Sequence, residues 1–161
     1  MNKIWKTIKD VEFNSMEECV QLLKKKNYIV SHWIVDIAKR SNASIQDINF
    51  PVELIRIKVS ELGFNNPTTL KEIYTKLDEN NLKPVHPLIA IGTRLFYDTQ
   101  PKGEWLRIAV PLESMIDSDG IPHLPKLGQG LNLLFIETYW SYPGAVFHPH
   151  NDFLFQKKNY F

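Results

Sequence analysis

The sequence predicts an α+β protein in which a mainly antiparallel meander sheet packs against a helix, preceded by a helical N-terminal segment. Three observations predict this class. Apolar residues recur at helical spacing before residue 50, a period-two alternation starts at Leu54, and short apolar runs between turn residues follow residue 85. We expect one domain over 1–161, with a helical segment over 1–50 and an α+β core over 51–161.

The N-terminal segment carries two helix-start signals. Ser15 followed by Glu18 is a capping box, and Ser31 is the expected N-cap of a second helix. Two successive helices also occur in helix-turn-helix DNA-binding proteins, but no basic recognition face follows here, which disfavours that interpretation.

The core begins with a strand over 54–59, whose alternation places Arg56 and Lys58 toward solvent. A helix follows, started either by Asn66 with Pro67 or by a Thr69 and Glu72 capping box. Further strands are expected over 93–97, 104–110, 131–140 and 152–157.

Composition excludes several classes of protein. The 161 residues have a net charge of +1, too small for a chain-wide field that attracts nucleic acid or anionic lipid. The single cysteine, Cys19, lies in the apolar pattern of the first helix and is interpreted as a buried hydrophobe. No secretory signal or membrane-spanning stretch is present, so we expect a cytoplasmic protein.

The first candidate site is a surface around a predicted hairpin loop, Gln100 to Gly103. In the strand that follows, Trp105 and Arg107 project to one face, and Arg94 or Tyr97 of the preceding strand is expected opposite them. Cations beside aromatic rings suit a carboxylate, a phosphate or a stacked base, although arginine also packs on aromatics for stability alone. The candidate ligand-binding residues are Arg94, Tyr97, Gln100, Lys102, Trp105 and Arg107.

The second candidate is a metal site. His148 and His150 are separated by one residue, so in an extended chain both imidazoles project to the same side, with Asp152 close behind. Further ligands would have to come from His123, His86, Glu137 or water. The prolines and glycine around this stretch also fit an ordinary exposed loop.

Two other patterns have simpler interpretations. The stretch from Asp117 to Gly120 resembles the start of a calcium loop, but it lacks the later glutamate and Asp119 with Gly120 is a common hairpin turn. Glu104 and Glu137 are a carboxylate pair on neighbouring expected strands, and sequence does not show whether they meet.

From about Pro51 to Lys157 the chain resembles a family of small bacterial proteins of unknown function. The matching blocks are VELIRIKVSELGF from Val52, TLKEIY from Thr69, LKP from Leu82 and TRLFYDTQPKGEWLRIAVP from Thr93, with a DG turn behind them. The HPHND stretch from His148 departs from the family pattern. The resemblance implies a discrete domain and no particular chemistry or cofactor.

Three functions remain open from the sequence. The first is an accessory or binding protein that holds a protein partner or an anionic small molecule on the face of Trp105 and Arg107. The second is a metal-dependent hydrolase built on His148, His150 and Asp152. The third, nucleic-acid binding through the two N-terminal helices, is disfavoured by the near-neutral charge.

Overall fold

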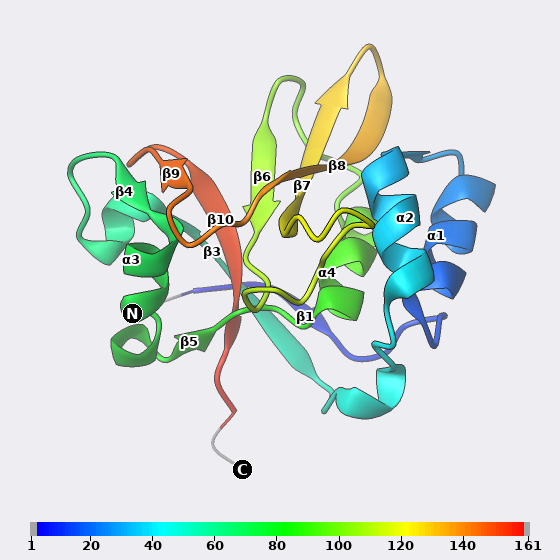
Figure 1. Ribbon diagram of the computed structural model, residues 1–161, viewed down its shortest axis with the longest axis horizontal. Coiled ribbons are helices and arrows are strands. Elements are labelled where there is room, and N and C mark those ends of the chain that lie inside the picture. The colour runs from blue at the N-terminus through cyan, green and yellow to red at the C-terminus, as the bar shows by residue number, and fades with distance from the viewer. Residues whose placement is uncertain (1–2, 160–161) are drawn as a thin grey trace.

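The computed structural model describes residues 3–159 and confirms the α+β class (Figure 1). The main sheet of this part of the chain has eight strands, ordered β1-β3-β10-β6-β7-β8-β2 with β5 added on β10. Its strands are β1 (Ile4–Ile8), β2 (Ile29–Val30), β3 (Val52–Lys58), β5 (Leu82–Lys83), β6 (Trp105–Ile108), β7 (His123–Gly130), β8 (Leu133–Trp140) and β10 (Asp152–Lys157). A small second sheet pairs β4 (Thr68–Thr69) with β9 (Val146–Phe147).

The helices are short. They are α1 (Met16–Lys25), α2 (His32–Arg40), α3 (Leu70–Thr75) and α4 (Pro87–Gly92), with 3-10 turns η1 (Ile45–Asp47), η2 (Val59–Leu62), η3 (Asp78–Asn80) and η4 (Thr93–Phe96). Figure 1 shows α1, α2 and α4 on one side of the sheet and α3 with the small sheet on the other.

The predicted helix starts are confirmed at three places. The Ser15 hydroxyl accepts from the amide of Glu18, Ser31 caps α2 by accepting from Trp33, and Thr69, rather than Asn66, caps α3. Cys19 is fully buried, as expected.

The sheet is mixed rather than a simple meander. β10 runs parallel to β6, and β2 runs parallel to β8, whereas the other pairs are antiparallel. The N-terminal fifty residues are not only helical, since they supply β1 at one edge of the sheet and β2 at the other. The sequence pattern missed both strands because β2 has two residues and β1 alternates weakly.

Two predicted strands are corrected. Residues 93–97 form η4 and the start of a loop, because the helix that begins at Pro87 continues as a 3-10 turn. The strand predicted from residue 131 begins at Leu133, since Leu131 and Asn132 form the turn between β7 and β8 with positive φ angles. The predicted partner of β6 is therefore wrong, and β7 takes that place.

None of the helices within residues 3–159 combines the length and apolar character needed to span a bilayer.

Candidate binding surface

One face of strands β6, β7 and β8 bears aromatic and cationic side chains in register. Across the three strands, Trp105 lies opposite Gly128 and Gly128 opposite Phe135. In the next row, Arg107 lies opposite Lys126 and Lys126 opposite Glu137, and Tyr139 follows on β8. We call this surface, made by Trp105, Arg107, Lys126, Phe135, Glu137 and Tyr139, the open face.

The ammonium group of Lys126 lies between two aromatic rings. Its Nζ is 4.4 Å from the ring centroid of Trp105 and 5.7 Å from that of Tyr139. Both distances fall within the range of cation–π attraction. Trp105 is 41% exposed, so its ring remains accessible despite this contact.

Arg107 continues the row of cations toward the small sheet. Its guanidinium carbon lies 5.4 Å from the ring of Tyr139 and 5.9 Å from the ring of Phe147 on β9. Phe147 is buried, whereas Arg107 and Tyr139 are only partly covered. Arg107 thus lies where the open face meets the part of the sheet covered by β9.

Neither cation of the open face has an anionic partner within the described residues. Within residues 3–159, the side chains of Arg107 and Lys126 form no salt bridge and no hydrogen bond. The Nε of Arg107 is buried without a hydrogen-bond partner. Glu137 faces Lys126 across the strands without forming a salt bridge. The buried Nε is a cost to the fold, and only the accessible part of this half-buried guanidinium can bind an external oxygen ligand.

The two cations destabilise each other in the absence of such a ligand. Burial lowers the pKa of Arg107, opposed by Tyr139 and Asp152. Burial, followed by repulsion from Arg107, lowers the pKa of Lys126, opposed by Glu137. A bound anion would offset the repulsion between the two cations.

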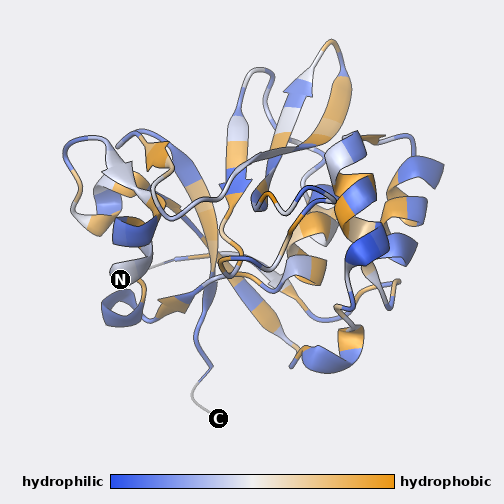
Figure 2. Ribbon diagram, viewed as in Figure 1, coloured by the Kyte–Doolittle hydropathy of each residue, from blue (hydrophilic) through white to orange (hydrophobic). Residues whose placement is uncertain are grey.

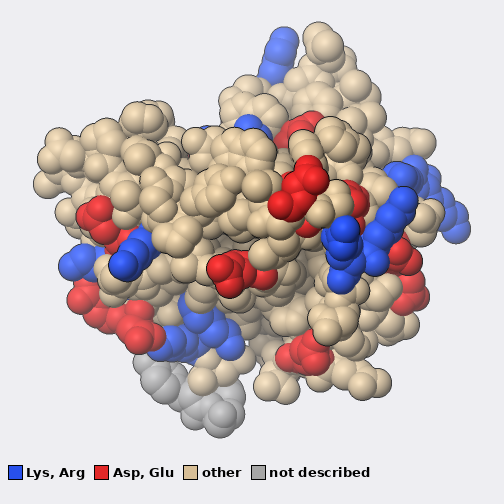
Figure 3. All heavy atoms as spheres, in the orientation of Figure 1, with Lys and Arg blue, Asp and Glu red and all other residues tan. Residues whose placement is uncertain are grey.

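Most of the open face lies on the hairpin of β7 and β8. Figure 1 shows β7 and β8 extending beyond the rest of the sheet, and Figure 3 shows the outline of the molecule indented between this hairpin and the lobe of α3, β4 and β9. Figure 2 shows the N-terminal half of β8 as hydrophobic. The tip of the hairpin bears Leu131, which is 84% exposed, and Leu133, which is 43% exposed.

Only part of the surface predicted from the sequence is brought together. Trp105 and Arg107 share the open face as expected, and Lys102 is exposed in the preceding loop. That loop joins η4 to β6, and its closing turn runs from Pro101 to Glu104 with φ of +81° at Gly103.

Arg94 and Gln100 have a structural role instead, because both are buried. The guanidinium of Arg94 donates to Oε1 of Gln100 at 2.7 Å and to the main-chain oxygens of Phe135 at 2.9 Å and Tyr97 at 2.5 Å. Burial lowers the pKa of Arg94 to about 10, opposed by nearby Tyr28 and acidic groups. The prediction that Arg94 faces the ligand surface was wrong, because it rested on a strand that is a 3-10 turn.

Tyr97 belongs to a polar network on the opposite face of the sheet. Arg56 donates to Glu104 at 2.6 Å, to Asp152 at 2.8 Å and to the hydroxyl of Tyr97 at 3.0 Å. Lys58 also contacts Asp152, at 3.2 Å. The alternation pattern predicted that Arg56 points into solvent. In the structure, Arg56 instead links β3 to β10 and to Glu104, the residue before β6. Glu104 and Glu137 lie on opposite faces of the sheet and form no carboxylate pair.

The predicted metal residues are not gathered around one point. The rings of His148 and His150 stack with centroids 5.6 Å apart, but Asp152 is engaged by Arg56 and Lys58. Among residues 3–159, no three His, Cys, Asp or Glu side chains are placed to hold a metal ion together. The pair of histidines lacks a third protein ligand in this part of the chain.

A buried His–Asp pair occupies the other side of β7. Asp117 accepts from the amides of Asp119 and Ile121, which closes the expected DG turn, and its second oxygen lies 2.8 Å from Nε2 of His123. Burial opposes ionisation of Asp117, but the hydrogen bonds from His123 and the two amides outweigh it and lower the pKa. Nδ1 of His123 is 3.0 Å from the hydroxyl of Thr138, so every polar atom of this pair has a structural partner.

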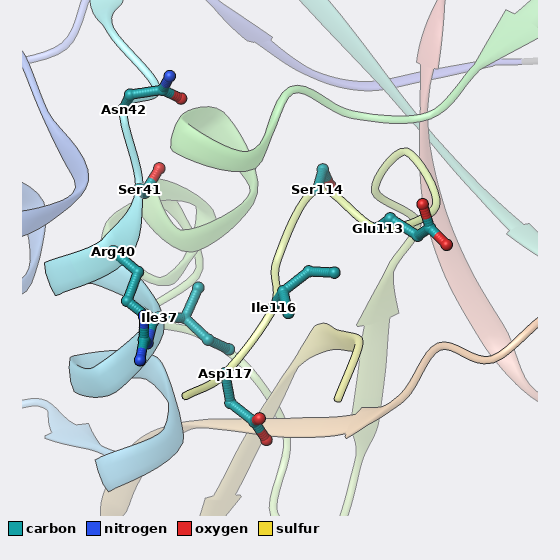
Figure 4. Close-up of a pocket in the computed structure, with 8 residues that line it drawn as sticks. All are labelled: Ile37, Arg40, Ser41, Asn42, Glu113, Ser114, Ile116 and Asp117. Carbon is teal, nitrogen blue, oxygen red and sulfur yellow. The ribbon is translucent and has the colours of Figure 1, made fainter. Parts of the chain in front are cut away.

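A pocket of about 250 Å³ lies next to this pair, between the end of α2 and the loop before Asp117 (Figure 4). The carboxylates of Glu113 and Asp117 point to different sides, and the side chain of Ile116 lies between these two residues. The charged groups that line the pocket do not converge, so it offers no catalytic arrangement.

Comparison with known proteins gives one distant likeness. The chain is 29% identical over 108 residues to the LexA repressor of Aeromonas salmonicida (strain A449). The match covers 64% of this chain and 51% of the repressor, so the chain spans about half the length of that relative. No family model matches the chain, and no solved structure matches it.

The sequence did not reveal Lys126, Phe135 or Tyr139 as members of the site. Lys126 lies in β7, where Pro125 and two glycines obscure the strand pattern, and its position opposite Arg107 depends on a pairing that sequence does not show. The aromatic residues of β8 were visible as strand residues, but their face was not.

Proposed function

We propose that this protein is a binding protein that holds an anionic group, a phosphate or a carboxylate, on the open face. The observation that carries the proposal is the pair of neighbouring cations, Arg107 and Lys126, that have no salt bridge within residues 3–159 and lie among accessible aromatic rings. Planar guanidinium groups suit the geometry of both anions, and an ammonium beside them adds charge.

A regulatory role is consistent with this proposal. The distant relative, 29% identical over about half of its own length, is a repressor by name, and this name is the support for a regulatory role. The resemblance to small bacterial proteins of unknown function adds no chemistry. The open face therefore remains the basis of the proposal.

Thermal unfolding in the presence of sodium tripolyphosphate or citrate tests the proposal. Either anion is expected to raise the unfolding midpoint, because ligands that bind only the folded state stabilise it. Lys126→Met keeps the apolar stem and removes the charge, so it should reduce the shift, while Lys39→Ala, at an exposed position of α2, should not. No response to either anion, or an equal response in Lys126→Met, would refute an anion site on the open face.

A further inference from the structure

The open face combines anion-binding groups with flat rings in a particular order. The Trp105 ring lies over Gly128 and is so close that a Cβ at position 128 would lie 2.4 Å from its Cζ3 atom. This contact places the six-membered ring against the β7 backbone and leaves the indole 41% exposed. The ring is thus held on the sheet surface rather than extended into solvent.

Two further rings lie beside it on β8. Phe135 is opposite Gly128, the glycine beneath Trp105, and Tyr139 is four residues along the same strand and face. All three rings are partly accessible. The row of Arg107, Lys126 and Glu137 therefore lies between Trp105 and Phe135 on one side and Tyr139 on the other.

Resting on the proposed function, we infer that the anionic ligand of the open face is single-stranded nucleic acid, with its bases stacked on the rings and its phosphates on Arg107 and Lys126. Sequence-tolerant binding of single strands uses this combination of a cationic surface and aromatic platforms. A free phosphate or an acidic peptide would use the cations but leave the accessible rings without a stacking partner.

The charges on the open face fit a binding site that contacts only two phosphates. Glu137 is the acidic residue in the row of the two cations, so binding relies on two phosphate contacts and not on a large basic field. The net charge of +1 disfavours long-range attraction but not such local contacts. Phosphate contacts of this kind release counterions, and two of them predict a slope of about −1.4 for log affinity against log salt.

The test compares three eight-unit probes by fluorescence anisotropy: a mixed-sequence single-stranded DNA, an abasic single strand and a duplex. The single strand is expected to bind about tenfold more tightly than the abasic strand, because stacked bases contribute to affinity. The duplex should bind less tightly than the single strand, since its bases are stacked internally. Trp105→Ala should remove most of the preference for bases.

Trp140→Ala is the matched control. Trp140 is 45% exposed, but its ring packs at a tilt against His123, with centroids 5.1 Å apart, on the face that α2 covers. Glu137→Gln should strengthen binding because it removes the acidic group from the row. Equal binding of the single and abasic strands would overturn the base-stacking inference and leave the proposed function intact. If the wild-type protein also showed no thermal shift with tripolyphosphate, the proposed function would be overturned too. Preference for the duplex, or equal binding of polyglutamate of matched charge, would also overturn the inference.

Discussion

The ring of Trp105 occupies the space above Gly128 in which a side chain at that position would begin, since a Cβ there would lie only 2.4 Å from Cζ3. The two residues are directly opposite in the β6–β7 register. Because glycine lets another group approach the backbone closely, the absence of a side chain at position 128 determines where the ring lies.

Gly128→Ala is expected to displace the Trp105 ring with little loss of stability. The indole is partly exposed and can move, so we expect the free energy of unfolding to fall by about 1 kcal/mol. The tryptophan emission spectrum should shift, and the response to tripolyphosphate should weaken. Urea unfolding together with emission spectra measures both effects. An unchanged spectrum would contradict the proposed contact.

Arg94→Leu is expected to destabilise the fold severely, because Arg94 is fully buried and donates to the main-chain oxygens of Tyr97, after η4, and of Phe135 in β8. Its removal leaves several buried oxygens without donors, at a cost of about 3 kcal/mol. Urea unfolding checks this value, with Lys126→Met as the comparison on the open face. A variant that kept its stability but lost anion binding would return Arg94 to the ligand site.

Local signals predicted much of the fold. Ser15, Ser31 and Thr69 cap helices as their hydroxyls predict. Alternation identified β3, and short apolar runs between turn residues identified β6, β8 and β10. Strand pairing was less accessible. β10 inserts between β3 and β6, and its parallel pairing with β6 joins segments far apart in the chain. Such non-local pairing has no signature in the local pattern.

In the candidate site, too, relationships within one strand could be predicted from the sequence and contacts between strands could not. Period-two alternation correctly placed Trp105 and Arg107 on one face, because that relationship lies within one strand. The partners of these residues depend on β7, whose Pro125 and glycines conceal its strand character. The error at Arg94 has the opposite cause, since a short helix was interpreted as a strand and a buried cation was assigned to the surface.

Acid is expected to weaken the fold through Asp152. Burial opposes ionisation of Asp152, but hydrogen bonds and attraction from Arg56, followed by Lys58, outweigh it and lower the pKa below the ordinary 3.8. The folded protein then binds fewer protons than the unfolded chain at acidic pH. The stabilisation is complete above the unfolded pKa near 3.8 and is lost as pH falls through the lower, folded pKa.

Urea unfolding between pH 6 and pH 2, a range of about four units around the carboxyl pKa, measures this dependence. Asp152→Asn should flatten the decline in the free energy of unfolding at acidic pH. Asp119→Asn removes an exposed carboxylate of the DG turn and is the matched control. Equal flattening in both variants would show that the Arg56 contact is not responsible.

Leu131→Asn is expected to stabilise the protein. Leu131 and Asn132 connect β7 to β8 with φ angles of +51° and +63°, and a branched side chain is unfavourable in this left-handed region. Asparagine tolerates the conformation, so the free energy of unfolding should rise by about 1 kcal/mol. Because Leu131 is 84% exposed, the substitution removes almost no buried apolar contact. Thermal and urea unfolding measure the gain, and Leu133→Asn, which changes a strand residue with negative φ, is the control. If Leu131→Asn is more stable yet binds single-stranded DNA less tightly, the exposed leucine at the hairpin tip contacts the ligand and its strained position serves binding rather than folding.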